Sequence, residues 1–209
     1  MTGLTPARAE DPSIVNIGVS ATERLVLVNA VLVDAFSDRI LEAIASGVPM
    51  TFVYSLELVE RVDVLPDKTV SRNTIQNTVH YDSLKDVFTV TSRGKGVNRK
   101  IVTKKPDQYR EWMLTLKDIP LAPLRRLDPN AQYYVRVKAE LDSDDFGFPF
   151  NFLLFFVPFN NFETSWAESS PLVLNPDLIF PQQVQGVDGD SSPEQASKGM
   201  KHVIRSFNR

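Results

Sequence analysis

The chain has 209 residues, of which 43% are hydrophobic and 23% charged, with a formal net charge of −3. This is the composition of a globular protein and excludes wholesale disorder, and a slightly acidic chain is not typical of a dedicated nucleic-acid-binding protein. The absence of cysteine excludes a disulfide framework, thiol catalysis and cysteine-ligated metals. No apolar run reaches the roughly 18 to 20 residues that a transmembrane helix needs.

The N-terminus carries a small-x-small pattern, Ala7-Arg8-Ala9, followed by the acidic residues Glu10 and Asp11. This is the form of a signal-peptidase site, although the charged and apolar regions that normally precede such a site are missing. We therefore interpret residues 1–12 as a signal-peptide remnant or a disordered N-terminus. The first reading predicts a periplasmic or secreted protein, whereas a chance match predicts a cytoplasmic one.

The first elements are two strands and a helix. Residues 13–19 are β-prone, and residues 25–33 carry apolar side chains at both alternating sets of positions, which predicts a strand buried on both faces. Ser37 is a suitable helix N-cap, and Gly47, with a proline shortly after it, ends a helix of two to three turns. The apolar stripe of this helix is Ile40, Leu41 and Ile44.

A series of strands linked by turns follows. Residues 51–64 show a period of two, with Phe52, Tyr54, Leu56 and Leu58 on one face. Residues 74–81 and 86–91 flank a hairpin loop at 82–85, and a Gly-Lys-Gly turn at 94–96 leads to a short strand around Ile101.

A second helix is expected from Pro106 at its first position, Asp107 in its first turn and Lys117 in its last. Its buried stripe is Tyr109, Trp112, Met113 and Leu116. A proline-rich connection over 120–130 then leads to a half-exposed strand at 133–141. The predicted fold is mainly β, or α+β: an antiparallel β-sandwich or curved sheet with two short packed helices.

Eight of the 13 phenylalanines lie between residues 146 and 162. This run is either a central strand buried on both faces, or a partly exposed aromatic patch that marks a partner or membrane surface. Residues 171–209 are rich in Pro, Gln, Gly, Asp and Ser, and we expect a polar, disordered extension. One β-rich domain is thus predicted over residues 13–170.

The chain offers little for catalysis. It has two histidines, His80 and His202, too few for a metal site, and no cofactor motif. His80 and Asp82 share a strand face and form the only catalytic fragment that we find. We therefore expect a protein that is not an enzyme and has no cofactor, with an enzyme built around His80 and Asp82 as an alternative.

Positive charge is concentrated between residues 93 and 110, where seven basic residues stand against Asp107 alone, a local charge of about +6. This stretch is either a solvated loop and helix start or an anion-facing patch for lipid headgroups. Nucleic acid is a less suitable ligand, because no aromatic residues interleave with the basic ones.

Three segments carry a resemblance. Residues 47–52 (GVPMTF), 80–88 (HYDSLKDVF) and 127–142 (LDPNAQYYVRVKAELD) are similar, in order and spacing, to a bacterial envelope family known as domain of unknown function 4390. The resemblance spans about residues 14–168. It implies a signal peptide and a membrane sensor kinase as a partner, but no activity and no catalytic residues. The chain departs from the family pattern where a closing tryptophan pair is expected: Phe159 or Phe162 replaces the first, and Trp166 stands for the second.

We expect a periplasmic, non-enzymatic binding module that contacts an envelope protein or the membrane surface. Anion contact is assigned to Arg99, Lys100, Lys104 and Lys105, and apolar contact to Phe155, Phe159 and Trp166. The alternative is an accessory sensor domain for a membrane-bound signalling kinase.

Overall fold

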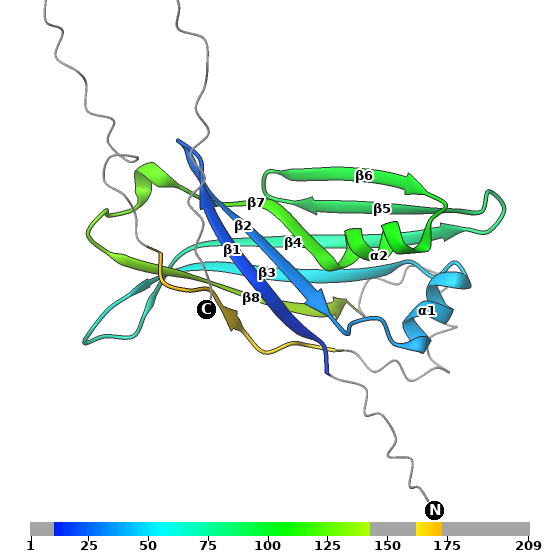
Figure 1. Ribbon diagram of the computed structural model, residues 1–209, viewed down its shortest axis with the longest axis horizontal. Coiled ribbons are helices and arrows are strands. Elements are labelled where there is room, and N and C mark those ends of the chain that lie inside the picture. The colour runs from blue at the N-terminus through cyan, green and yellow to red at the C-terminus, as the bar shows by residue number, and fades with distance from the viewer. Residues whose placement is uncertain (1–10, 143–161, 173–209) are drawn as a thin grey trace, which may run out of the picture.

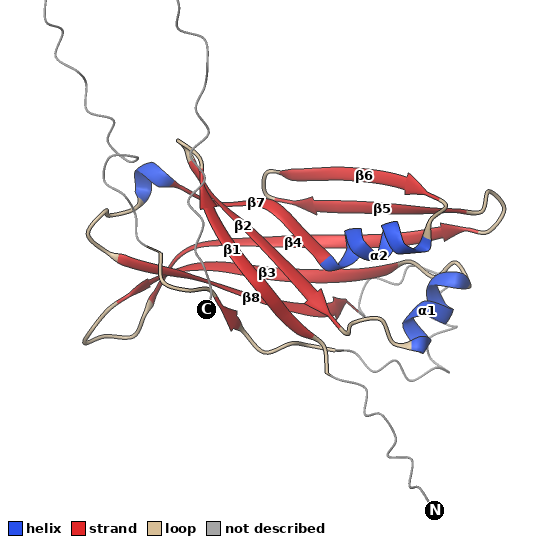
Figure 2. Cartoon of the chain, in the orientation of Figure 1, coloured by secondary structure: helices blue, strands red, loops and turns tan. Residues whose placement is uncertain are grey.

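The computed structural model describes residues 11–142 and 162–172. Its strands are β1 (Ser13–Ala21), β2 (Leu25–Val33), β3 (Met50–Arg61), β4 (Lys68–Asp82), β5 (Val87–Gly94), β6 (Val97–Thr103), β7 (Thr115–Pro123), β8 (Gln132–Asp142) and β9 (Ala167–Glu168). Its helices are α1 (Asp38–Ala45), α2 (Pro106–Leu114) and the short 3-10 helix η1 (Leu124–Arg126). Strands follow one another through short turns, and the described part of the chain is mostly strand (Figure 2).

The strands form two antiparallel sheets that pack face to face. The smaller sheet has the order β1-β2-β7, and the larger has the order β6-β5-β4-β3-β8-β9. In Figure 1 the strands β1 and β2 run diagonally across the larger sheet, and α2 lies beside them on β4 and β5. This arrangement confirms the prediction of a mainly β fold with two short packed helices.

The core is organised around β3, which is hydrogen-bonded to β4 on one side and to β8 on the other. Its inward side chains Met50, Phe52, Tyr54, Leu56 and Leu58 are all fully buried. Burying an apolar side chain of this size contributes about 1.5–3 kcal/mol relative to leaving it exposed. The predicted period of two is therefore confirmed, and it fixes which face of the sheet points inward.

The helix α1 begins and ends as the sequence predicts. The hydroxyl of Ser37 accepts a hydrogen bond from the backbone N–H of Ile40, which satisfies one of the free N–H groups of the first turn. The helix closes at Gly47, whose φ of +83° is a conformation that glycine adopts without strain. Ile40 and Ile44 are buried.

The second helix is shorter than predicted. It ends at Leu114, and the chain continues without a loop into β7, so that Lys117 belongs to a strand and not to the last helical turn. Leu116 fits both interpretations, because it is seven residues after Tyr109 on a helix and also faces inward from β7, where it is buried.

The proline-rich connection predicted after this helix was also wrong in its first part. Pro120 and Pro123 lie in β7, opposite Leu27 and Leu25 of β2. Because β7 is the last strand of its sheet, a missing backbone N–H on its outer side removes no ladder hydrogen bond, and proline is tolerated there.

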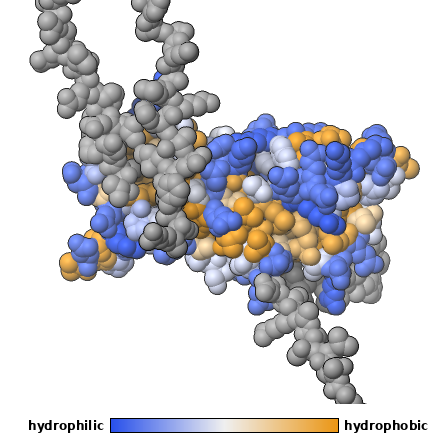
Figure 3. Space-filling view, in the orientation of Figure 1, coloured by the Kyte–Doolittle hydropathy of each residue, from blue (hydrophilic) through white to orange (hydrophobic). Residues whose placement is uncertain are grey.

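The strand β2 has the predicted bounds but is not buried on both faces. Its inward residues Val26, Val28, Ala30 and Leu32 are buried, whereas Leu25 on the other face is 37% exposed and Leu27 is only half-buried. Figure 3 shows hydrophobic residues gathered at the surface over the C-terminal part of β2. The apolar character of both faces reflects a central strand of a three-stranded sheet, of which only one face packs on the larger sheet.

The strand β8 has the predicted alternation of exposure. Beyond it, the amide of Leu172 donates to the carbonyl of Tyr133, so the first residues of the predicted C-terminal extension join this strand. Most of the predicted N-terminal remnant, the phenylalanine run up to residue 161 and residues 173–209 lie outside the described residues. Phe162, the last residue of the run, packs edge-on against Phe52 with ring centroids 5.3 Å apart.

The close packing of β4 and β5 gives a test of the fold at Gly94. A Cβ added here would lie 2.5 Å from the carbonyl oxygen of Thr74 and 2.4 Å from Cδ1 of Ile75. Backbone cannot yield as a side-chain end can, so we expect Gly94→Ala to lower the free energy of unfolding by about 1–3 kcal/mol, the usual cost of overpacking. Urea denaturation measures this change. Gly18→Ala is the matched control, because its nearest contact would be an ordinary 3.9 Å; equal stability of the two variants would contradict the packing.

Candidate functional site

The basic stretch of the sequence forms one edge of the larger sheet. The β5–β6 hairpin turns at Gly96, whose φ is +74°, and β6 pairs only with β5, so its other side is an open sheet edge. Side chains alternate along a strand. Asn98, Lys100 and Val102 therefore point away from the smaller sheet, whereas Arg99 points toward it and donates to the carbonyl of Lys117 at 2.7 Å.

The four residues predicted to contact an anion thus do not form one surface. Lys100 lies on the outer face of β6, and Arg99 lies on the opposite, inner face. Lys104 and Lys105 follow the strand, and Lys105 occupies the N-cap position of α2. The Lys104 ammonium lies 3.8 Å from an Asp86 carboxylate oxygen, and both side chains are about two-thirds exposed. Such a surface pair contributes little to stability and leaves the lysine available.

The outer side of the edge nevertheless carries a concentration of cations. Arg93, Lys95, Lys100 and Lys105 are exposed, and among the described residues none of them forms a salt bridge. Lysine side chains at a sheet edge also disfavour pairing with a strand of another chain. This group of residues, together with Lys104, is called the basic edge below.

Two exposed apolar side chains lie at the same end of the molecule as the C-terminal end of β6. Leu84, in the β4–β5 turn, is 97% exposed, and Val102 on the outer face of β6 is 59% exposed. The hydrophobic tip of this turn projects from a mostly hydrophilic part of the surface (Figure 3). Neither residue was predicted as a contact residue, although a leucine between Ser83 and Lys85 in a polar turn indicates an exposed apolar side chain.

Of the predicted apolar contact residues, only Trp166 belongs to the described part of the chain. Phe155 and Phe159 are outside the described residues, and Trp166 lies next to β8, with its ring 4.8 Å from the guanidinium of Arg136 and 5.7 Å from the ammonium of Lys138. The strand order places β8 four strands from β6, about 19 Å at the usual spacing. Trp166 is therefore well separated from β6, although Arg136 and Lys138 point, like Lys100, to the outer face of the larger sheet.

The neighbourhood of Trp166 contains a buried carboxylate. Glu57, on the outer face of β3, is 8% exposed and lies between Arg72 of β4 and Arg136 of β8. Its Oε1 accepts from Nε of Arg72 at 2.6 Å, and its Oε2 accepts from Nε of Arg136 at 2.7 Å. Burial raises the pKa of Glu57, but the hydrogen bonds and charges of the two guanidinium groups outweigh burial, and the net pKa is lowered.

In the predicted catalytic fragment, Asp82 makes its contacts within its own turn and not with His80. Asp82 accepts hydrogen bonds from the backbone N–H groups of Leu84 and Lys85, and its other oxygen lies 3.0 Å from the Lys85 ammonium. These contacts lower the pKa of Asp82 and close the β4–β5 turn. His80 is exposed on the outer face of β4. Over residues 11–142 and 162–172 no group of three or more His, Asp or Glu side chains is placed to hold a metal ion.

These features define a two-sheet antiparallel β protein with one open, basic sheet edge. The model of a family described as a domain of unknown function (DUF4390) matches residues 9–170, and the chain belongs to this family. No curated protein and no solved structure matches the chain. Among the helices that the structure describes, none is long and apolar enough to cross a membrane.

The Glu57 cluster predicts a pH-dependent contribution to stability. Because the folded-state pKa of Glu57 is lowered, its stabilising contribution is fully present above the unfolded-state pKa and is lost as the pH falls through the folded-state pKa. We expect Glu57→Gln to lower the free energy of unfolding by about 1.5–3 kcal/mol at neutral pH. The gap between wild type and variant should shrink below the ordinary pKa of a glutamate, as urea denaturation at a series of pH values would show.

Glu163→Gln is the matched control, because Glu163 is paired with Lys138 at 2.5 Å but is 62% exposed. An exposed pair of this kind contributes about 0.2–1 kcal/mol. A gap for Glu57→Gln that stays constant down to about pH 3 would contradict the assigned role of the ionised carboxylate.

Proposed function

We propose that this protein is a non-enzymatic module of the bacterial envelope that binds the anionic surface of a membrane through the basic edge. The observation that carries the proposal is the group of exposed cations on and next to β5 and β6, of which Arg93, Lys95, Lys100 and Lys105 lack carboxylate partners within the described chain, near the exposed Leu84 and Val102. Each lysine or arginine close to an anionic bilayer contributes about 1 kcal/mol to binding.

The arrangement favours surface binding over insertion. The cations lie on the outer face and at the end of a flat, open-edged hairpin, so several can approach one plane together. Leu84 projects from the adjacent turn, in which Asp86 lies 3.8 Å from Lys104 at the end of β6. One apolar side chain at each of two positions adds interfacial contact but is too little for stable anchoring. The Ala7-Arg8-Ala9 pattern and the resemblance described above favour an envelope location.

The proposal predicts salt-sensitive binding to anionic vesicles. The full chain should co-sediment with vesicles of phosphatidylcholine and phosphatidylglycerol at low salt, bind more weakly at physiological salt, and not bind phosphatidylcholine alone, because ions screen exposed charges. Replacing Lys100, Lys104 and Lys105 by Glu should weaken partitioning by at least about 100-fold, since three contributions of about 1 kcal/mol are lost and then reversed.

The control reverses the same amount of charge at the other end of the molecule. Arg24, Arg125 and Arg126 are exposed in the β1–β2 turn and in η1, far from the tip of β6 (Figure 1). Replacing these three by Glu should leave most of the binding. Equal losses in the two triple variants would show that only net charge matters, and no binding of the wild type at low salt would overturn the proposal.

A further inference from the structure

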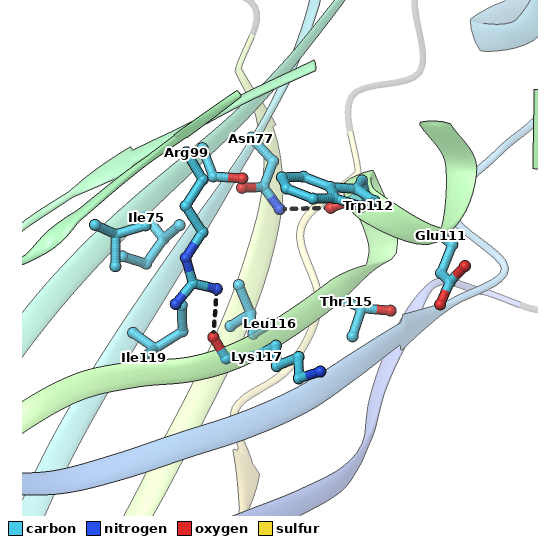
Figure 4. Close-up of a pocket in the computed structure, with 11 residues that line it drawn as sticks. Ile75, Asn77, Arg99, Glu111, Trp112, Thr115, Leu116, Lys117 and Ile119 are labelled. Carbon is cyan, nitrogen blue, oxygen red and sulfur yellow. Dashed lines mark hydrogen bonds between the residues drawn. The ribbon is translucent and has the colours of Figure 1, made fainter. Parts of the chain in front are cut away.

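A pocket lies on the inner side of the basic edge, between β4, β5 and β6 of the larger sheet and α2 and β7. Its volume is about 230 Å³, which corresponds to about seven or eight water molecules in the liquid. Its apolar walls come from Ile75, Trp112, Leu116 and Ile119, and its polar groups include Asn77 and Arg99 (Figure 4).

The pocket coincides with a polar row on the inner face of the larger sheet. Asn77, Ser92 and Arg99 lie side by side on β4, β5 and β6. Asn77 is 1% exposed and Ser92 is 7% exposed. The inward rows on either side hold Ile75, Gly94 and Val97, and Val79, Val90 and Ile101. A single polar row inside a core is costly unless its groups find partners.

One atom of this row has no partner in the described chain, the side-chain oxygen of Asn77. The amide nitrogen of Asn77 donates to the carbonyls of Trp112 and Met113, at 3.2 Å each. Only a nitrogen can donate to two carbonyls, so the oxygen cannot exchange places with it. In Figure 4 the nitrogen faces Trp112 and the oxygen turns toward the side of Arg99.

A comparison with Asn73, on the same strand, shows that a buried asparagine in this sheet does not generally leave its side-chain oxygen without a partner. Asn73 is also buried, but its nitrogen donates to the carbonyls of Lys95 and Pro120 and its oxygen accepts from the N–H of Lys95. Both ends of that amide are therefore satisfied by the protein. At Asn77 the buried acceptor is left without a partner in the described chain, and Asn77 is one of the residues that line the pocket.

The far end of the row is cationic. The guanidinium of Arg99 uses one N–H on the carbonyl of Lys117 and keeps others, since arginine has five. Lys117 and Glu111 are also among the residues that line the pocket. The remaining N–H groups of the Arg99 guanidinium favour an anionic group on a ligand.

We propose that this pocket binds a small hydroxylated carboxylic acid with an apolar body. The hydroxyl donates to the oxygen of Asn77, the body packs against Trp112 and Leu116, and the carboxylate accepts from Arg99. Asn77 and Arg99 are two strands apart, about 9–10 Å, which suits a molecule the length of an aromatic hydroxy acid. The proposal does not rest on membrane binding, because Arg99 and Lys100 lie on opposite faces of β6.

The test uses 4-hydroxyphenylacetate as the probe and the full chain, with binding followed by ¹H–¹⁵N NMR. Titration should shift the side-chain amide of Asn77 and the indole N–H of Trp112. Phenylacetate, which lacks the donor, and tyramine, which lacks the carboxylate, should each bind at least about tenfold more weakly, because each leaves one polar group of the pocket unpaired.

The matched variants are Arg99→Met and Lys100→Met, two neighbours on opposite faces of β6. Arg99→Met should weaken 4-hydroxyphenylacetate binding at least about tenfold, and Lys100→Met should leave it unchanged. Replacing Asn77 would also remove two hydrogen bonds that hold α2, so the comparison with phenylacetate tests the contact to its oxygen instead. The absence of shifts with 4-hydroxyphenylacetate, equal binding of phenylacetate, or equal effects of Arg99→Met and Lys100→Met would each overturn the proposal.

Discussion

The arrangement of the two sheets depends on how the free carbonyl groups at the C-terminal end of α2 find hydrogen-bond donors. This helix runs directly into β7, so the carbonyls of its last turn lack intrahelical partners and are carried into the interior. The hydroxyl of Tyr54 donates to the carbonyl of Met113 at 2.6 Å, and the amide of Asn77 donates to the carbonyls of Trp112 and Met113. Side chains of β3 and β4 thereby cap the helix and fix the point at which the chain enters the smaller sheet.

The junction between α2 and β7 also determines which part of the inner face of the larger sheet stays uncovered. The smaller sheet has three strands and the larger has six, so β1, β2 and β7 cannot cover the whole inner face of their partner. The helix α2 packs on β4 and β5 and contacts β6, which is left as an edge and is joined to β7 through Arg99 and the carbonyl of Lys117. The pocket is the space that remains between this edge, α2 and β7. The same constraint therefore produces the open edge and the cavity behind it.

Sequence patterns predicted the elements whose two faces differ, such as β3, β8 and α1. They failed where one pattern suits two structures: Leu116 fits a helical stripe as well as a strand, and β2 is apolar on both faces although only one packs on the larger sheet. The basic edge was visible as a run of charge, but its division between two faces depends on strand alternation. Asn77 was missed although it interrupts the inward series Ile75, Val79, because a buried polar residue in a strand is informative only once its partners are known.

Strand alternation also decides how the two proposed binding activities relate. Adjacent residues of β6 serve opposite sides of the sheet: Lys100 faces solvent on the outer surface, and Arg99 faces the pocket and β7. A one-residue slip in the pairing of β5 and β6 would exchange these roles and turn Ile101 outward. The register of β5 and β6 is held against such a slip by the tight turn at Gly96, and the register of β4 and β5 is held by Gly94, where the close approach of Thr74 leaves no room for a side chain. The two glycines of the β5–β6 hairpin therefore maintain the separation between a surface that faces an anionic plane and a pocket that receives a small acid.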